Sequence, residues 1–415
     1  MGMKKDSQKP GVFDEIRVLD CTTQIQGPYL TRLMADMGAE IIKVERPGEG
    51  DPTRWAPYIM GKGESGNFMQ RNCGKKSISL DLKRPEAIEI VKQLTKISDV
   101  VVENYRPGVM ARLGIDYPKL REVNPRIIMC SLSGFGQYGP YFDRATGDTL
   151  IQALTLGMEM TGDPEGPPQI CGLAYVDFCS GTHGLAAVSA ALYYREKTGI
   201  GQHIDIALFD VAFGMHESAI QEYILSGGKI KYTRFGSHKK DLVPVGVYKG
   251  RDGYLAIAAV GDRSWANMAK VMGRPELISD ERFDTQIHRV EHRDEVIQIV
   301  SEFVQSCSSI MEANRLFTEG DVPSEPVLTV DQLMNNPQLE ARELLVEVDQ
   351  PTFGKVKVVN SPFHFSDTVS GARGRVPRLG EHNEEVLTTL LGYSTERIEG
   401  LYKEGVLYNI DREVG

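Results

Sequence analysis

The sequence predicts an α/β protein in which a large domain with a Rossmann-like parallel sheet is joined to a smaller α+β domain. Two observations lead to this prediction. In the first half of the chain, short β-branched or apolar segments alternate with amphipathic segments of helical period, as they do in parallel sheets flanked by helices. From about Leu225 the pattern changes to glycine-spaced loops, a hairpin and several helices. A chain of 415 residues is long enough for two domains.

The elements of the first half follow from their residue patterns. Strand character is expected in segments 16–21, 41–44, 100–103 and 127–132, and helical character in segments 29–37 and 85–96. A long helix of small residues then runs from Asp177 to Arg195. Because small side chains let another backbone approach closely, we expect this helix to be buried.

The second half contains a different set of elements. A hairpin is expected from strands 245–248 and 254–258 around the turn 249–253, followed by helices 264–272, 292–305 and 308–319. Strand-like segments 344–348 and 355–359 and a terminal helical region come after them. We therefore divide the chain into residues 1–224 of the large domain, a small domain of residues 225–330, and residues 331–415, which return to the large domain.

The composition limits the classes of partner. A formal net charge of −10 argues against nucleic acid or an anionic membrane surface as the partner, because both need a basic face. An anionic ligand would then need a local basic cluster, and residues 71–84 offer one, although a solvated surface shows the same pattern. No secretory signal and no apolar run of about 18 residues occurs, so we expect a cytoplasmic protein. The six cysteines contain no C-x-x-C pair, which indicates neither a zinc site nor disulfides.

Residues 134–139 satisfy the dinucleotide-binding pattern G-x-G-x-x-G directly after a predicted strand. A functional fingerprint must open a helix and be followed by an acidic residue about 20 positions later at a strand end. Here Pro140 follows, and Asp163 lies in a turn. This context argues against nicotinamide binding. Serine-hydrolase elbows, H-E-x-x-H and Walker motifs are also missing from the sequence, which leaves carboxylate chemistry.

Asp177 is the candidate for that chemistry. At the start of a helix, an aspartate can simply act as the N-cap. The helix dipole would also keep the carboxylate ionised, as a nucleophilic carboxylate must be. His183 lies further along and could serve as a base or as a packed core residue.

Ordered matches over almost the whole chain resemble the class III CoA-transferases, the family that includes formyl-CoA transferase, carnitine CoA-transferase and the α-methylacyl-CoA racemases. The matching segments are 27–28, 34–45, 50–54, 72–82, 102–108, 133–140, Asp177 with its helix, and 198–202. The resemblance implies a CoA-transferase whose two subunits interlock like rings, as a homodimer or as a heterodimer with a homologous subunit. No tightly bound cofactor or metal is implied, because coenzyme A and its thioesters are substrates.

The resemblance also implies roles for individual residues. Asp177 stands where the family has its catalytic aspartate, Asp148 at the position of an assisting carboxylate, and Gln26 near the thioester. Asp148 could equally cap a helix before Leu150. Backbone N–H groups at the helix start could stabilise the developing oxyanion. The implied coenzyme A contacts are Lys43, Arg46, Lys75, Lys76, Asn104, Tyr105 and Arg112.

Two departures from the family pattern affect the expected reaction. Residues 234–244 replace a run of glycines that shields the intermediate in formyl-CoA transferase, and His238, Lys239 and Lys240 within them could bind a second carboxylate of the acyl group. Gly147 stands where racemases have a histidine, which argues against racemisation.

Three hypotheses follow. The first is CoA transfer from succinyl-CoA or a similar donor to an organic acid, with an arylsuccinate or another dicarboxylate as a candidate acceptor, through aspartyl anhydride and thioester intermediates. The second is an acyl-CoA epimerase that uses Asp177 as a base. The third is a non-catalytic subunit of a heteromeric transferase.

Overall fold

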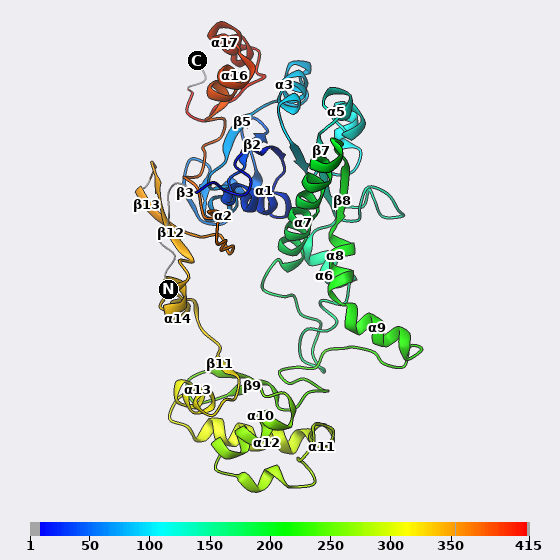
Figure 1. The fold of residues 1–415 in the computed structure, drawn as a ribbon, viewed down its shortest axis with the longest axis vertical. Helices are drawn as coiled ribbons and strands as arrows, with labels where there is room; N and C mark the ends of the chain where they lie inside the picture. Colours follow the sequence, from blue (N-terminus) through cyan, green and yellow to red (C-terminus); the bar gives the residue numbers. More distant parts are fainter. Residues whose placement is uncertain (1–8, 353, 413–415) are drawn as a thin grey trace. The chain divides into compact units, whose positions relative to one another are not determined.

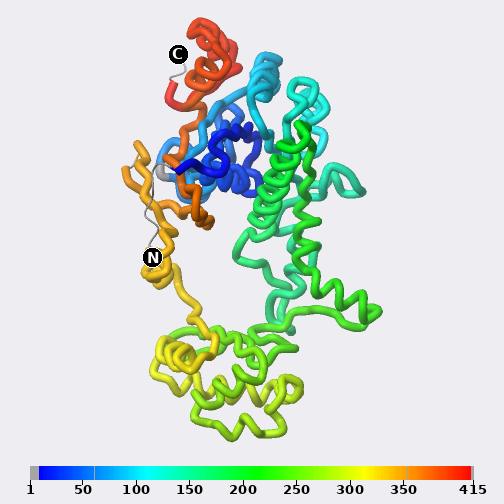
Figure 2. Tube along the Cα trace, in the orientation of Figure 1, coloured from blue at the N-terminus to red at the C-terminus, as the bar shows by residue number. Residues whose placement is uncertain are grey.

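The computed structural model describes residues 9–352 and 354–412. Contacts divide the chain into two compact units (Figure 1). Unit 1 contains residues 1–155, 172–217 and 338–415, and unit 2 contains residues 156–171 and 218–337. The chain therefore passes from unit 1 to unit 2 and back twice, at residues 156–171 and again at residues 218–337. Figure 2 traces the backbone by residue colour. The contacts place residues 156–171 with unit 2, whereas the division made from the sequence has them in the large domain.

Unit 1 is built around a six-stranded sheet in which all neighbouring strands are parallel, as the alternating pattern predicts. The strand order is β5-β2-β1-β6-β7-β8. The strands are β1 (Arg17–Cys21), β2 (Glu40–Glu45), β5 (Lys76–Ser79), β6 (Val100–Glu103), β7 (Ile128–Ser133) and β8 (His203–Ala207).

The strand order creates a switch point between β1 and β6. From β1 the chain builds outward through β2 and β5, and then crosses to β6 and continues through β7 to β8. This is the order of doubly wound nucleotide-binding sheets, in which a crevice forms outside the carboxyl ends of the two central strands. Cys21 and Glu103 end these strands as register partners. The loops that follow them therefore border the crevice.

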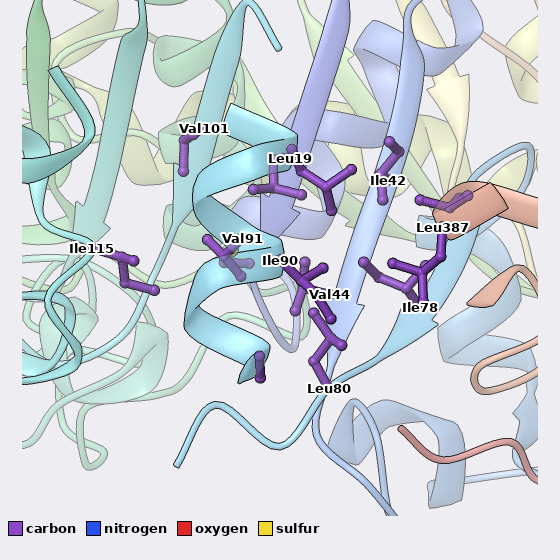
Figure 3. Close-up of a cluster of buried hydrophobic side chains, with 14 of the residues drawn as sticks. Leu19, Ile42, Val44, Ile78, Leu80, Ile90, Val91, Val101, Ile115 and Leu387 are labelled. Atoms are coloured by element: carbon purple, nitrogen blue, oxygen red, sulfur yellow. The ribbon is translucent and has the colours of Figure 1, made fainter. Parts of the chain in front are cut away.

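Both faces of the sheet are covered. On one face, Leu19 and Val44 pack with Ile90 and Val91 of α3 (Pro85–Lys96), and the same cluster reaches Leu387 of α16 (Asn383–Leu391) (Figure 3). On the opposite face, the core joins strand residues to α1 (Gln26–Asp36) and α7 (Tyr175–Thr198). Strands that are buried on both sides are mainly apolar, which fits the Val, Ile and Leu residues of the inner strands. The buried polar exceptions include Asp20 and Lys43.

Helix α7 packs closely on α1 through its glycines. A Cβ added to Gly181 would lie 2.7 Å from the main-chain oxygen of Gln26, and one added to Gly184 would lie 2.5 Å from Leu30 Cδ1. The expectation of close approach is thus confirmed. Burial, however, is limited to one side of the helix, because Tyr193 and Tyr194 are exposed.

The remaining elements complete unit 1. They are η1 (Pro52–Trp55), β3 (Ile59–Gly61), β4 (Glu64–Ser65), α2 (Gly66–Asn72), α4 (Val109–Leu113), α5 (Tyr117–Val123), α6 (Asp148–Leu154), α8 (Leu208–Met215), β12 (Leu345–Gln350), β13 (Gly354–Val359) and α17 (Thr395–Lys403). After the G-x-G-x-x-G match at residues 134–139 no helix begins until Asp148, which confirms that this match does not open a helix.

Unit 2 has its own core and a three-stranded antiparallel sheet of order β11-β10-β9. The predicted hairpin is present, because β9 (Val245–Lys249) pairs with β10 (Tyr254–Ala258). The other elements are β11 (Ser324–Pro326), α10 (Gly261–Val271), η2 (Pro275–Ile278), α11 (Gln286–Glu291), α12 (Arg293–Ser306), α13 (Ile310–Glu319) and α14 (Val330–Met334). Two helices lie at the unit boundaries, α9 (Glu217–Leu225) and α15 (Pro337–Ala341). No helix within the described ranges is both long and apolar enough to cross a membrane.

Candidate active site

A pocket of about 240 Å³ lies at the carboxyl ends of the central strands of unit 1. Residues 23–26 after β1 and 104–107 after β6 line it, together with the end of β7, Phe142, residues 144–148 and Asp177. This is the crevice that the strand order creates, and it is where doubly wound sheets bind ligands.

Asp177 is the third residue of α7 and does not cap it. The cap comes from Asp148, whose Oδ2 accepts the main-chain N–H of Val176 at 2.8 Å and that of Asp177 at 3.1 Å. The N-cap interpretation of Asp177 is therefore wrong, because the chain enters the helix two residues earlier. No donor in the described part of the chain contacts the Asp177 carboxylate, which is left free for a ligand.

Asp148 is the first residue of α6 and is buried. Its second oxygen, Oδ1, accepts a hydrogen bond from Gln152 Nε2 at 2.5 Å. Asp148 therefore does cap a helix, but this helix is α7 and not its own α6. With both oxygens engaged, the Asp148 carboxylate is held in one orientation beside Asp177.

The pKa of Asp177 is raised to about 7. Burial is the largest cause, the negative charge of Asp148 adds to it, and the Arg71 guanidinium opposes both. The helix start was expected to hold this carboxylate ionised. Burial and the charge of Asp148 act in the opposite direction.

Gln26 begins α1 and lines the same pocket. Its side chain is buried, and none of the described residues accepts a hydrogen bond from Nε2. A buried amide donor without a partner is costly, so this group is suited to meet a ligand oxygen. The close packing of α1 on Gly181 of α7 brings Gln26 to the pocket that contains Asp177.

Asn104 and Tyr105 line the pocket from the loop after β6. Asn104 holds the loop after β1 by accepting the Thr23 N–H at 2.8 Å and donating to the Thr23 main-chain oxygen at 2.8 Å. The Tyr105 N–H donates to the Glu103 carboxylate at 2.9 Å. The two loops that form the switch point are therefore fastened to each other.

The lysines predicted to contact coenzyme A do not line the pocket. Lys43 is fully buried with Nζ 2.7 Å from the Thr22 oxygen and 3.2 Å from Asp51 Oδ2. Lys75 is equally enclosed, with Nζ 2.9 Å from Asp20 Oδ2. Because these ammonium groups are bonded inside the fold, the structure does not support phosphate contacts for Lys43 or Lys75.

The other predicted cations lie at the surface. Lys76 pairs with Glu40 and Glu385, each at 2.8 Å. Arg46 pairs with Glu49. Arg112 is exposed in the last turn of α4 and is not among the pocket-lining residues.

Two arginines that were not assigned to the site from the sequence do line the pocket, Arg106 and Arg144. Arg106 belongs to the matching segment 102–108, so its position after Asn104 and Tyr105 could have indicated it. Arg144 belongs to an irregular loop and its guanidinium lies 5.5 Å from the Tyr141 ring centroid. No periodic pattern marks such a residue.

The predicted substrate residues His238, Lys239 and Lys240 belong to unit 2. His238 packs edge-on against Tyr248 with 4.7 Å between ring centroids, and its pKa is lowered by burial and by Arg293. Lys239 Nζ lies 5.0 Å from the Phe235 ring centroid, and Lys240 is exposed. A lowered pKa makes His238 a weaker candidate partner for a carboxylate.

Comparisons with known proteins agree with this architecture. Residues 13–383 match the family described as CoA-transferase family III. The chain is 34% identical over 404 residues to succinyl-CoA:glutarate CoA-transferase of Mus musculus, covering 97% of this chain and 91% of that protein. It is 34% identical over 401 residues to succinyl-CoA–D-citramalate CoA-transferase of Chloroflexus aurantiacus, covering 96% and 98%.

A solved structure shows the same fold. The crystal structure of a CAIB/BAIF family protein from Brucella suis superposes with a TM-score of 0.82 at 33% identity, covering 92% of this chain and 100% of that one. The relatives are CoA-transferases whose names specify a CoA thioester and an acid. This chain belongs to CoA-transferase family III and is a CoA-transferase.

Proposed function

We propose that this protein transfers coenzyme A from succinyl-CoA to a dicarboxylic acid, with the Asp177 carboxylate as the acyl carrier. The observation that carries the proposal is an unpartnered carboxylate in the switch-point pocket, where the sheet topology favours ligand binding. The donor and the class of acceptor are supported by relatives named for succinyl-CoA with glutarate, citramalate and mesaconate, which are all dicarboxylates. An arylsuccinate fits the same class.

The first half of the reaction loads coenzyme A onto Asp177. The ionised carboxylate attacks the thioester carbonyl, the C–S bond breaks, and the products are an aspartyl mixed anhydride and the CoA thiolate. The thiolate then attacks the aspartyl carbonyl of the anhydride, which releases succinate and leaves an aspartyl-CoA thioester. Each step forms one acyl bond and breaks another.

The second half reverses these steps with the acceptor. The acceptor carboxylate attacks the aspartyl thioester and forms a new anhydride with release of the thiolate. The thiolate then attacks the acceptor carbonyl, which gives the acceptor-CoA thioester and the free Asp177 carboxylate. No proton is gained or lost overall, and no ATP is required because one thioester replaces another.

The groups around Asp177 suggest how the charged intermediates are stabilised. The N–H groups of Val176 and Asp177 are occupied by Asp148, so they are not available to an oxyanion as the sequence suggested. The unpartnered Gln26 Nε2 is the better candidate donor. Asp148 acts as a positioning residue that fixes the start of α7.

Coenzyme A binding is assigned to the pocket-lining loops. Arg106 and Arg144 supply the positive charge for phosphates, in place of the buried lysines. Asn104 and Tyr105 form the adjoining wall. Arg46 and Arg112 remain exposed cations that a long ligand could reach.

We also propose that two chains interlock, as a homodimer or with a homologous subunit. Unit 1 exposes large apolar side chains on α7 and α8, including Tyr193, Tyr194, Phe213 and Met215. Such surfaces are typical of interfaces. One relative is named as the β subunit of a succinyl-CoA–L-malate CoA-transferase.

Hydroxylamine trapping tests the function. With succinyl-CoA present, hydroxylamine should convert Asp177 to a hydroxamate, which peptide mass spectrometry would locate. An unmodified Asp177 during turnover would contradict the proposal. Solvent deuterium entering the α-carbon of an acyl-CoA without an acceptor would instead favour the epimerase, and full activity of the Asp177→Ala variant would favour the non-catalytic subunit.

A further inference from the structure

Arg71, on α2, is a buried cation without a hydrogen-bonding partner. The residue is only 9% exposed and its Nε is buried. Within the described ranges, no side chain or main-chain oxygen accepts a hydrogen bond from its guanidinium, and no carboxylate forms an ion pair with it. Buried arginines are normally paired, because a desolvated charge without partners is costly. The mechanism proposed above does not use this residue.

Arg71 lies near Asp177, close enough for the two charges to interact, although Arg71 itself does not line the pocket. Its Cζ is 5.8 Å from the ring centroid of Phe178, the residue after Asp177. The charges of Asp51 and Asp177 both act on Arg71, and they partly offset the effect of burial, which lowers its pKa. Asp51 is already bonded to Lys43, and to the N–H groups of Gln24 and Thr53. Asp177 is therefore the carboxylate that balances Arg71 without being bonded elsewhere.

Helix α2 holds Arg71 in a defined position. Ser65 caps the helix by accepting the Phe68 N–H at 3.1 Å, and the Phe68 ring is buried under the Arg54 guanidinium at 3.7 Å. Asn72 Nδ2 donates to the Phe68 oxygen at 3.1 Å. A cation held on a packed helix loses little freedom when it binds a ligand, which favours specific recognition.

The charge of the site changes during the proposed reaction. When Asp177 is acylated, its carboxylate becomes a neutral anhydride or thioester, and Arg71 loses the negative charge that balanced it. A carboxylate at the far end of the acyl group restores that balance. A monocarboxylic acyl group leaves a buried cation without compensation, which is unfavourable.

We propose that Arg71 binds the distal carboxylate of the acyl group carried on Asp177 and thereby selects dicarboxylic substrates. A guanidinium suits this role because it can meet a carboxylate with two parallel hydrogen bonds. The inference rests on the proposed function, and it assigns to unit 1 the carboxylate recognition that the sequence placed at His238, Lys239 and Lys240.

Isotope exchange between a thioester and its own free acid tests the inference without knowledge of the natural acceptor. The full-length protein is given succinyl-CoA with labelled succinate, or butyryl-CoA with labelled butyrate, and labelled thioester is measured by mass spectrometry. Butyryl matches succinyl in chain length but lacks the distal carboxylate. We expect the wild-type protein to exchange succinate much faster than butyrate.

The Arg71→Gln variant should lose about a hundredfold in kcat/KM for succinate exchange, as expected for the loss of a desolvated charge pair, with butyrate exchange nearly unchanged. Arg71→Lys keeps the charge but not the paired hydrogen bonds. Its kcat/KM for succinate exchange should lie between the values of the wild-type protein and Arg71→Gln. Lys62→Gln removes one exposed positive charge before α2 and should match the wild-type protein. Circular dichroism establishes that each variant is folded.

Several outcomes would overturn the inference. Equal slowing of both exchanges in Arg71→Gln would show that Arg71 affects the reactivity of Asp177 and does not recognise the distal carboxylate of the acyl group. Wild-type exchange of butyrate as fast as succinate would exclude selection for the distal carboxylate, even if Arg71→Gln does not fold. Failure of the wild-type protein to exchange either acid would instead contradict the proposed function, because both exchanges use the Asp177 anhydride.

Discussion

Oδ2 of Asp148 lies 3.1 Å from the main-chain nitrogen of Asp177 and accepts its hydrogen bond. Asp148 thus fixes the start of the helix that carries Asp177. The negative charge of Asp148 also makes the Asp177 carboxyl group harder to ionise. The structure therefore couples the placement of Asp177 to its proton affinity, and this coupling determines several measurable properties.

Asp177→Asn should abolish CoA transfer, with kcat reduced by at least about a thousandfold, because an amide cannot form the anhydride. Transfer would be measured by mass spectrometry of the thioester products. Asp367→Asn changes an exposed carboxylate in the same way and should retain wild-type activity. Comparable rates in the two variants would exclude Asp177 as the acyl carrier.

The acid limb of the pH profile of kcat/KM should report an apparent pKa of about 7, because only ionised Asp177 attacks the thioester. Activity should therefore fall as the pH decreases through neutrality. Asp148→Asn removes the neighbouring negative charge, so the pKa of Asp177 should decrease and the limb should move to lower pH. If the acid limb of Asp148→Asn lies at the same pH as that of the wild-type protein, the charge of Asp148 does not raise the pKa of Asp177.

The same carboxyl group should affect stability in a predictable direction. Its pKa is higher in the folded protein than the ordinary value of 3.8, so the unfolded chain releases this proton at lower pH. Between pH 3.8 and pH about 7, rising pH therefore favours the unfolded state. Asp177→Asn should therefore raise the thermal midpoint more at pH 8 than at pH 5, as differential scanning calorimetry can measure. The opposite order would indicate that Asp177 is stabilised as the anion.

Lys75 and Asp20 should contribute to stability as a buried pair. Lys75→Met leaves a buried carboxylate without its partner, and should lower the free energy of unfolding by about 3–5 kcal/mol in urea titrations. Lys76→Met removes a partly exposed pair and should cost less than about 1 kcal/mol. Similar losses in both variants would contradict a role of Lys75 within the core.

Gly181 should be required for the packing of α1 on α7. A Cβ there would lie 2.7 Å from the Gln26 oxygen, so Gly181→Ala should displace Gln26 and lower kcat/KM for succinyl-CoA about tenfold or more. Gly214→Ala is the matched control, because a Cβ at this helical position meets nothing within 4 Å. Unchanged kinetics in Gly181→Ala would show that α1 can shift without consequence for the site.

The sequence by itself determined the main elements of the parallel sheet. Segments 41–44 and 100–103 form inner strands buried on both faces, and their residues are apolar except Lys43 and Glu103. The edge strands β5 and β8 were not predicted. Lys76–Ser79 contains a single apolar residue, and His203–Ala207 is short and carries the polar residues His203 and Asp205. The ordered matches to a known family also singled out Asp177, Asp148 and Gln26, which the structure brings to one pocket.

Only the tertiary structure decided which charges are available to a ligand. The sequence does not show which lysine or arginine is paired. Lys43 and Lys75 form ion pairs with carboxylates inside the fold, whereas Arg71 forms none with the residues that the structure describes. Likewise, the sequence allowed Asp177 to be the cap of its own helix, whereas the cap comes from Asp148, 29 residues earlier. Hydrophobic periodicity records which positions face a core. The partner of a buried charge depends on segments far apart in the chain, and no local pattern encodes it.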